Sequence, residues 1–463
     1  MTRATEPATT LLAQRLLADG DAAGAGLVTA EILRDELGLD IATCVVNRDG
    51  YSLNSVNGAV TTSAGERFFF KFHAEEDAER TAGEWYRAGL LADAGYPVDR
   101  PLHVVTSPRR QVLLYRWRID ERLADACLRV EQRSRQRSPQ RTSASTSIER
   151  SPTDHFGDLD GGSDDADVLV AEQRALDTIA GRVLVDTLHF ATEADVAAEP
   201  IHQLFHHRLV DPDRPEALGA RAQRFYVHRS FALPGATLDW AAFGPARWNV
   251  NGQALDDTFA DLLERARVLL HPANPALRPA VVAHGDAHNA NVWRTPNGLV
   301  LFDPAFAGSH MPALLAEVKA TFHNVWAHPF WLYHPAQSPY EATVRFVDGV
   351  LHVDTDWSPS PLRDAFQSSK ADLVWRPLLG ALRDRGWLHP DWRATVRAAL
   401  FACPALVMNL RSGEGAAGRD PVTSLVGLTV AMLAGSEGSP FDAWFDSIDP
   451  IHPVDAASQT AQS

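Results

Sequence analysis

Three oxygen-bearing side chains, Asp286, Asn291 and Asp303, have the types and spacing that phosphoryl transfer needs. Asp286 and Asn291 lie in the run His-Gly-Asp-Ala-His-Asn-Ala-Asn, and Asp303 follows the apolar run Leu-Val-Leu-Phe. One carboxylate can take the proton of an attacking hydroxyl. An amide oxygen and a second carboxylate can hold the Mg²⁺ that neutralises the phosphates of ATP. We therefore expect Asp286 to be the base and Asn291 and Asp303 to be the magnesium ligands.

The two histidines of this run allow more than one interpretation. We expect His284 to hydrogen-bond the backbone and brace the loop, and His288 is ambiguous in the same way. A rival hypothesis makes His284, Asp286 and His288 the zinc or iron cluster of a metal hydrolase. The sequence contains no His-x-His or His-Glu-x-x-His partner, which disfavours the rival.

The run as a whole resembles the motif of the aminoglycoside phosphotransferase family, the bacterial branch of the protein-kinase-like fold. That motif is His-Gly-Asp, a His two residues later, an Asn, and a strand that ends in Asp, and each position is filled here. Recognisable motifs cover roughly 45–127 and 278–320. The resemblance implies an α+β, protein-kinase-like bilobal fold with a small antiparallel-sheet N-lobe and a large helical C-lobe. It also implies ATP-dependent phosphorylation of a hydroxyl on a small molecule, such as a sugar, an antibiotic or a related metabolite.

Lys71 is the candidate ligand for the nucleotide phosphates. It lies in Phe-Phe-Phe-Lys-Phe, where a charge is costly unless it has partners. In kinases the partners are the phosphates and a glutamate on the next helix; an exposed edge lysine is the alternative. The stretch from Glu84 to a Gly-Tyr-Pro-Val turn looks like the family's glutamate-led helix. We therefore choose Glu84, with Glu79 second and Glu75 and Glu76 as further competitors.

Two weaker elements complete the predicted nucleotide site. Gly50-Tyr51-Ser52-Leu53-Asn54 resembles the family's Gly-x-x-Asn element, which places Ser52 and Asn54 near the phosphates, although the same residues suit an ordinary hairpin turn. Tyr115 lies in the segment 113–117, where the hinge would be. Its backbone is expected to meet the adenine, and no side-chain role is predicted.

The segment after Asp303 departs from the family. A second Asp that often opens the next helix is absent here or replaced by Glu317, and Asp-Pro-Ala stands in place of the Asp-Phe-Gly of protein kinases. Residues 304–340 contain one acid and many aromatic and histidine residues. Such side chains can stack on a sugar or a flat ring, or can simply pack the core. We expect a neutral or weakly charged acceptor rather than a polyamine.

The hydrophobic periodicity supports this architecture. It predicts helical structure over 10–39, then strands at Ile41–Val46, Ser52–Val60 and Arg67–His73, a helix over 74–95, and a hairpin from Leu102–Val105 and Gln111–Trp117. From 167 onward helical patterns dominate, notably at Ala171–Leu184, Phe259–Leu270, 311–326, 361–385, 391–411 and 421–434. The predicted domains are an N-lobe with hinge over 1–127, an insertion over 128–166, and a helical C-lobe over 167–463. We expect the insertion to be disordered because 131–166 is rich in Ser, Arg, Asp and Gly and has few apolar residues. The alternative is a regulatory or docking segment with phosphorylated serines.

Composition limits the functional classes. The chain has 463 residues, is 45% hydrophobic, and carries a formal net charge of −16, which argues against nucleic acid or an anionic membrane as the partner. Its three cysteines are far apart, and a cytoplasmic location is expected. No signal-peptide core or membrane-spanning apolar run is seen. A small-molecule hydroxyl acceptor is the expected partner, and two alternatives stay open: a catalytically silent kinase-like binding protein, and a protein kinase.

Overall fold

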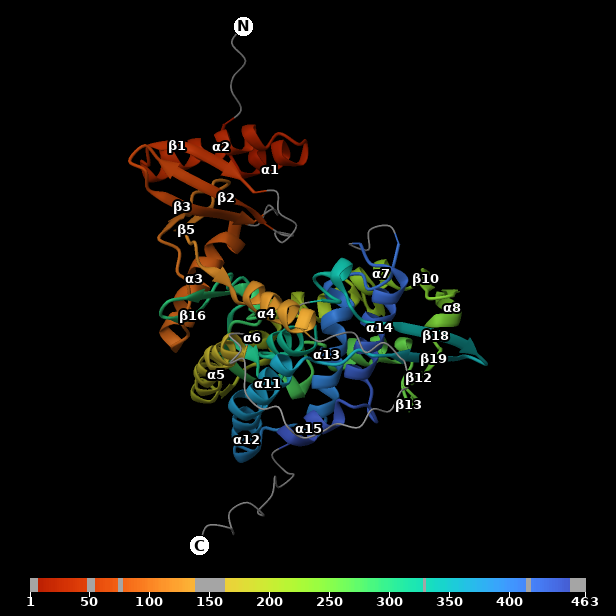
Figure 1. Ribbon diagram of the computed structural model, residues 1–463. Coiled ribbons are helices and arrows are strands. Elements are labelled where there is room, and N and C mark those ends of the chain that lie inside the picture. Colours follow the sequence, from red (N-terminus) through yellow and green to blue (C-terminus); the bar gives the residue numbers. More distant parts are fainter. Residues whose placement is uncertain are drawn as a thin grey trace, which may run out of the picture.

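The computed structural model describes residues 7–47, 55–73, 78–137, 163–327, 330–413 and 418–449. Figure 1 shows a small N-terminal part, built around one sheet, above a larger part made mostly of helices. Each part has its own hydrophobic core of buried side chains. The predicted α+β fold class, with an N-terminal antiparallel sheet and a helical remainder, is therefore confirmed.

The N-terminal part is a five-stranded antiparallel sheet in the order β1-β2-β3-β5-β4. Its elements are α1 (Thr10–Ala18), α2 (Ala22–Leu37), β1 (Ile41–Val46), β2 (Ser55–Thr62), β3 (Arg67–His73), α3 (Ala78–Ala94), β4 (His103–Val105) and β5 (Val112–Arg116). In β3 the buried Phe70 and Phe72 point into the core with Val56 and Val60 of β2. The strong apolar content of β3 thus places Lys71 in the middle of the sheet, in register with Asn57.

The helical stretch predicted over 10–39 is two helices. Gly20 has a φ of +87°, which ends α1, and the Asp21 side chain then accepts a hydrogen bond from the backbone of Gly24 as the N-cap of α2. The remaining N-terminal strands agree with the prediction closely, and β1 and β3 have the predicted bounds. The predicted residues 52–54 of the second strand lie outside the described residues.

The C-terminal part contains most of the helices. They are α4 (Leu123–Arg137), α5 (Ser163–Asp186), α6 (Glu193–Ala197), α7 (Ala220–Phe225), α8 (Trp240–Phe243), α9 (Phe259–Leu269), α10 (Val318–Thr321), α11 (Pro361–Lys370), α12 (Arg376–Asp384), α13 (Trp392–Val407), α14 (Pro421–Gly435) and α15 (Asp442–Ile448). Two π-helical segments, η5 (Phe322–Ala327) and η7 (Ala371–Trp375), and the short 3₁₀ turns η1 (Pro200–Gln203), η2 (His206–Arg208), η3 (Pro275–Leu277), η4 (Asn289–Asn291) and η6 (Pro335–Gln337) join them.

Small sheets accompany these helices. The strands are β6 (Glu121–Arg122), β7 (His189–Phe190), β8 (Val210–Asp211), β9 (Arg214–Leu218), β10 (Ser230–Leu233), β11 (Ala236–Asp239), β12 (Arg247–Val250), β13 (Gln253–Leu255), β14 (Pro279–Ala283), β15 (Val292–Thr295), β16 (Gly298–Leu301), β17 (Gly308–Pro312), β18 (Ala342–Val347) and β19 (Val350–Thr355). The antiparallel pair β15–β16 connects Asn291 to Asp303, and β14 pairs with β17 on either side of residues 284–291. The helix predicted over 311–326 therefore begins later, because Met311 and Pro312 end strand β17.

The two ends of the predicted insertion are helical. Helix α4 continues to Arg137 and helix α5 begins at Ser163, while 138–162 lie outside the described residues. Glu131 on α4 is buried and forms an ion pair with Arg363 of α11 at 2.7 Å. A charged side chain that the composition assigned to solvent is thus held in the interior by a specific partner. Within the described ranges, every helix is too short or too polar to cross a membrane.

Candidate active site

A cleft of about 960 Å³ lies between the N-terminal sheet and the C-terminal part. Lys71, Glu84 and Tyr115 line it from the N-terminal side, and Asp286, Asn291 and Asp303 line it from the other. Residues separated by more than two hundred positions therefore meet in one cavity. Among the predicted site residues, Ser52 and Asn54 fall outside the described residues.

Lys71 has two carboxylate partners in this cleft. Its Nζ lies 3.0 Å from Glu84 Oε2 and 2.5 Å from Asp303 Oδ1. Burial alone would lower the pKa of Lys71, but the charges of Asp303 and Glu84 raise it above its ordinary value. Lys71 therefore stays protonated in the interior and can bind an anion. Of the competing glutamates, Glu75 and Glu76 lie outside the described residues, and the side chain of Glu79 is not described.

Tyr115 has a side-chain role that sequence did not predict. Its hydroxyl donates to Glu84 Oε1 at 2.5 Å, so Glu84 is held by both Tyr115 and Lys71. Strand β5 brings the tyrosine there because Tyr115 pairs in register with Phe69 of β3. The residues that follow, Arg116, Trp117 and Arg118, also line the cleft.

The loop that carries Asp286 is fixed by backbone contacts. The ring of His284 bonds on one side to the Phe302 carbonyl at 3.0 Å and on the other accepts from the Asp286 N–H at 3.3 Å. Both ring nitrogens are therefore occupied, which leaves none for a metal. Gly285 has a φ of +74°, and a Cβ there would lie 2.8 Å from Met311 Cε. The glycine is required both by its backbone conformation and by the close packing.

Asp286 forms an ion pair with a lysine that sequence analysis did not single out. Lys319 of α10 places its Nζ 2.6 Å from Asp286 Oδ1, and both side chains are buried. Burial would raise the pKa of Asp286, but the charge of Lys319, with a smaller effect from His288, lowers it below its ordinary value. Asp286 is therefore ionised at neutral pH and can accept a proton. Burial lowers the pKa of His288 to about 4, so that ring is neutral at the same pH.

Asn291 and Asp303 present oxygen atoms near this carboxylate. The Asn291 amide nitrogen donates to the Asp286 carbonyl at 3.0 Å, so the amide oxygen is the atom that could bind a metal ion. The Asp303 side chain is 39% exposed and its φ is +57°, a strained conformation for a residue other than glycine. An amide oxygen and a carboxylate fit Mg²⁺, which keeps several waters. Within the described ranges, no group of three or more His, Cys, Asp and Glu side chains has a metal-binding arrangement, so the rival hydrolase cluster lacks a ligand set.

Glu317 belongs to an internal ion-pair network, and the π-helix η5 contacts the loop that carries Asp286. Glu317 is buried against Lys370 at 2.6 Å, which in turn meets Asp177 at 2.9 Å, so this acid lies in an internal ion-pair network. In η5 the Asn324 side chain accepts from the backbone N–H of Asn289 at 2.7 Å. Local π-helical geometry thus directs a polar side chain toward the loop that carries Asp286.

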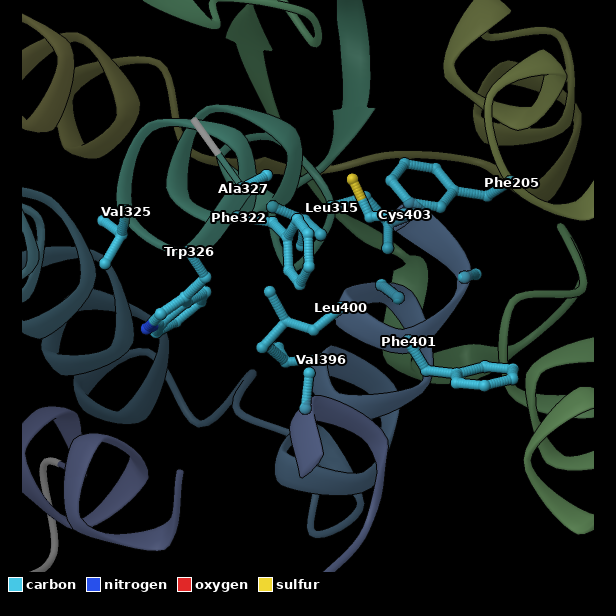
Figure 2. Packing of buried hydrophobic residues seen from close by; sticks show 14 of the residues in the cluster. Phe205, Leu315, Phe322, Val325, Trp326, Ala327, Val396, Leu400, Phe401 and Cys403 are labelled. Atoms are coloured by element: carbon cyan, nitrogen blue, oxygen red, sulfur yellow. The ribbon is translucent and has the colours of Figure 1, made fainter. Parts of the chain in front are cut away.

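The aromatic stretch after Asp303 is mostly core. Phe322, Trp326 and Trp331 are buried, and Figure 2 shows Phe322 and Trp326 packed with Val396 and Leu400. Among the aromatic and histidine residues of this stretch that the structure describes, Phe306 and Tyr333 line the cleft. The interpretation of these side chains as a stacking platform for the acceptor is therefore wrong for the buried members. Phe322 and Trp326 could be recognised as core because they lie four residues apart in the same apolar helical run, whereas Trp331 lies in a turn after η5.

Comparisons with known proteins place few constraints on this chain. No protein-family model matches it, and no curated protein matches it. Among solved structures, a type I macrolide 2'-phosphotransferase matches with 12% identity and a TM-score of 0.37, covering 84% of this chain and 91% of its own. The macrolide 2'-phosphotransferase MphH from Brachybacterium faecium matches with 13% identity and a TM-score of 0.33, covering 80% and 96%. A choline kinase from Cryptosporidium parvum matches with 10% identity and a TM-score of 0.31, covering 88% and 94%. Similarity at these values carries neither an activity nor a substrate over to this chain.

Proposed function

We propose that this chain is a small-molecule kinase that transfers the γ-phosphoryl group of ATP to a hydroxyl. The observation that carries the proposal is the meeting, in one cleft, of a lysine paired with Glu84 and Asp303 and of the ionised Asp286 beside Asn291. A protonated lysine, an ionised base and two oxygen ligands are the groups that phosphoryl transfer uses. Their presence together argues for an enzyme over a silent binding protein.

Each residue has one task in this proposal. Lys71 binds the nucleotide phosphates, with Glu84 and Tyr115 fixing its position. Asn291 and Asp303 hold Mg²⁺, which supplies neutralising charge at the phosphates when it is bound. Asp286 accepts the proton of the acceptor hydroxyl while the hydroxyl oxygen bonds to the γ-phosphorus and the bond to the bridging oxygen breaks, leaving ADP. Lys319 keeps Asp286 ionised until the hydroxyl arrives.

A small acceptor is favoured over a protein substrate by the segment that follows Asp303. In protein kinases a long activation segment lies there. Here strand β17 begins at Gly308 and pairs with β14, so residues 304–307 alone separate it from Asp303. We infer that a polypeptide substrate has no such segment to bind.

The test is turnover measured as ADP release over a panel of hydroxyl compounds. Asp286→Asn should reduce kcat by roughly 10²–10⁴ while the affinity for Mg·ATP stays within a few-fold. Asp303→Asn should weaken Mg·ATP binding in a calorimetric titration. Asp348→Asn is the matched control, because Asp348 lies in an exposed hairpin turn and is not among the residues that line the cleft. Full turnover in Asp286→Asn would refute the role of the base.

A further inference from the structure

The cleft has the opposite charge balance to the chain. The chain carries a net −16, yet the described residues that line the cleft include seven arginines and two lysines against four carboxylates. Those four carboxylates are already paired with cleft cations. Glu84 and Asp303 meet Lys71, Asp99 meets Arg118, and Asp286 meets Lys319. A surplus of positive charge therefore remains, concentrated where a ligand would lie.

Part of this surplus lies on the C-terminal side, away from Lys71. Arg208 ends η2, and Arg221 and Arg224 lie on α7, which packs against η2. Arg221 donates to the backbone carbonyls of Leu406 and Val407, and Arg224 lies over the ring of Phe225. No carboxylate of the described residues forms an ion pair with any of these three arginines.

Arg208 is the most informative of the three. Its Nη1 is buried and has no hydrogen-bond partner in the described part of the chain. Burial, together with the neighbouring charge of Arg221, lowers the pKa of Arg208 to about 9, and Asp286 lies close enough to offset part of that shift. A buried guanidinium nitrogen without an acceptor is costly, and such a cost is expected where a ligand supplies the acceptor.

We propose that the acceptor is an anionic hydroxyl compound, whose carboxylate or phosphate is bound by Arg208 with help from Arg221 and Arg224. This rests on the proposed function, because Asp286 fixes where the reacting hydroxyl lies and Arg208 is its cationic neighbour. A planar guanidinium suits either anion, since each can accept two parallel hydrogen bonds. The neutral or weakly charged acceptor expected from the aromatic stretch is replaced, because most of that stretch is core.

Binding can be tested without turnover. The full-length protein is saturated with Mg²⁺ and a β,γ-imido analogue of ATP, so that the nucleotide phosphates already occupy their own site. Inorganic phosphate, D-glucuronate and D-glucose are then titrated calorimetrically. We expect one of the two anions, or both, to bind roughly tenfold or more tightly than D-glucose. Tighter binding of phosphate would indicate a phosphate-bearing acceptor, and tighter binding of D-glucuronate would indicate a carboxylate-bearing acceptor.

Variants assign the binding to Arg208. Arg208→Met should weaken anion binding by roughly 10- to 100-fold, the usual loss for a hydrogen-bonded charge. Arg208→Lys should restore part of it, because the charge remains but the two-pronged geometry is lost. Arg214→Met is the control, since Arg214 is exposed and pairs with Asp211 outside the cleft. A melting temperature of Arg208→Met equal to or above that of the wild type would separate ligand binding from a structural role.

The inference is overturned if D-glucose binds as well as both anions, if neither anion binds, or if Arg208→Met leaves anion binding unchanged. A fall in melting temperature of Arg208→Met with unchanged anion affinity would identify a purely structural arginine. Failure of the proposed function is a separate result. A protein that binds the anion through Arg208 but releases no ADP with any hydroxyl compound would retain this site and lose the kinase assignment.

Discussion

The ion pair between Lys319 and Asp286 makes a quantitative prediction. The charged atoms lie 2.6 Å apart, and the residues are 5% and 8% exposed. Removing one partner of such a pair leaves the other charge buried and uncompensated, which costs about 3–5 kcal/mol. Lys319→Met and Asp286→Asn should each destabilise the protein by that amount. The double variant buries neither charge, so its destabilisation should be well below the sum of the two single-variant values.

The predicted changes are measurable as melting temperatures. A chain of this length has an unfolding entropy of about 1 kcal/mol/K, so each single variant should melt about 3–5 °C lower if the chain unfolds as one unit. Differential scanning calorimetry at about pH 7.5 on the wild type, both single variants and the double variant gives the coupling. Arg267→Met is the control, because Arg267 pairs with Glu264 at the surface, where an ion pair contributes little.

The pH dependence adds an independent check. In the wild type the pKa of Asp286 is lowered, so its stabilising effect is present above the ordinary value for aspartate and lost as pH falls through the folded value. In Lys319→Met burial acts without the lysine and raises the pKa of Asp286. Protonation of Asp286 should therefore remove the uncompensated charge in Lys319→Met. The difference in stability between this variant and the wild type should narrow as the pH falls from about 7.5 to about 5. Additive single effects, or a deficit that does not change with pH, would refute the coupling.

Three further predictions follow from the same geometry. Tyr115→Phe should raise KM for ATP and lower the melting temperature, because Glu84 loses its 2.5 Å hydrogen bond from Tyr115. Equal KM and melting temperature in the variant and the wild type would show that Tyr115 does not hold Glu84 in place. Gly285→Ala should reduce both stability and kcat, since its φ is +74° and its Cβ would meet Met311; unchanged calorimetry and kinetics would show that the loop adapts. Burial lowers the pKa values of His202, His206 and His288 to about 4, so stability should be full above about pH 6.5 and fall towards about pH 4. A melting temperature constant across that window would contradict this.

The N-terminal part was readable from sequence because its signals are local. The Phe-rich run of residues 67–73 strongly favours a strand, and β3 begins and ends where predicted. The C-terminal hairpins were missed although two turns carried a signal. Asn251-Gly252 and Asp348-Gly349 all have positive φ, the conformation of the tight turns that join β12 to β13 and β18 to β19. The helical periodicity of the flanking sequence is the stronger signal, so these two turn dipeptides alone do not reveal the hairpins.

The candidate site likewise has a part that the sequence predicts and a part that it does not. Asp286, Asn291 and Asp303 share one short run, so their spacing could be recognised, whereas the partners that set their charge could not. Lys319 follows Glu317 in a stretch whose pattern indicates only a buried helix, and its ion pair depends on how α10 packs against the loop.

The acceptor side shows why an overall charge is a poor guide to a binding site. A net charge of −16 describes the whole surface, and electrostatic attraction within a cleft depends on the few groups that line it. Arg208 and Arg221 come from a segment without any recognised motif, and η2 and α7 bring them to the side of the cleft where Asp286 lies. An acidic exterior would slow the approach of an anionic acceptor, while the arginines would hold it once inside. If the acceptor is anionic, kcat/KM should therefore rise with moderate salt that screens the exterior, before higher salt weakens the arginine contacts.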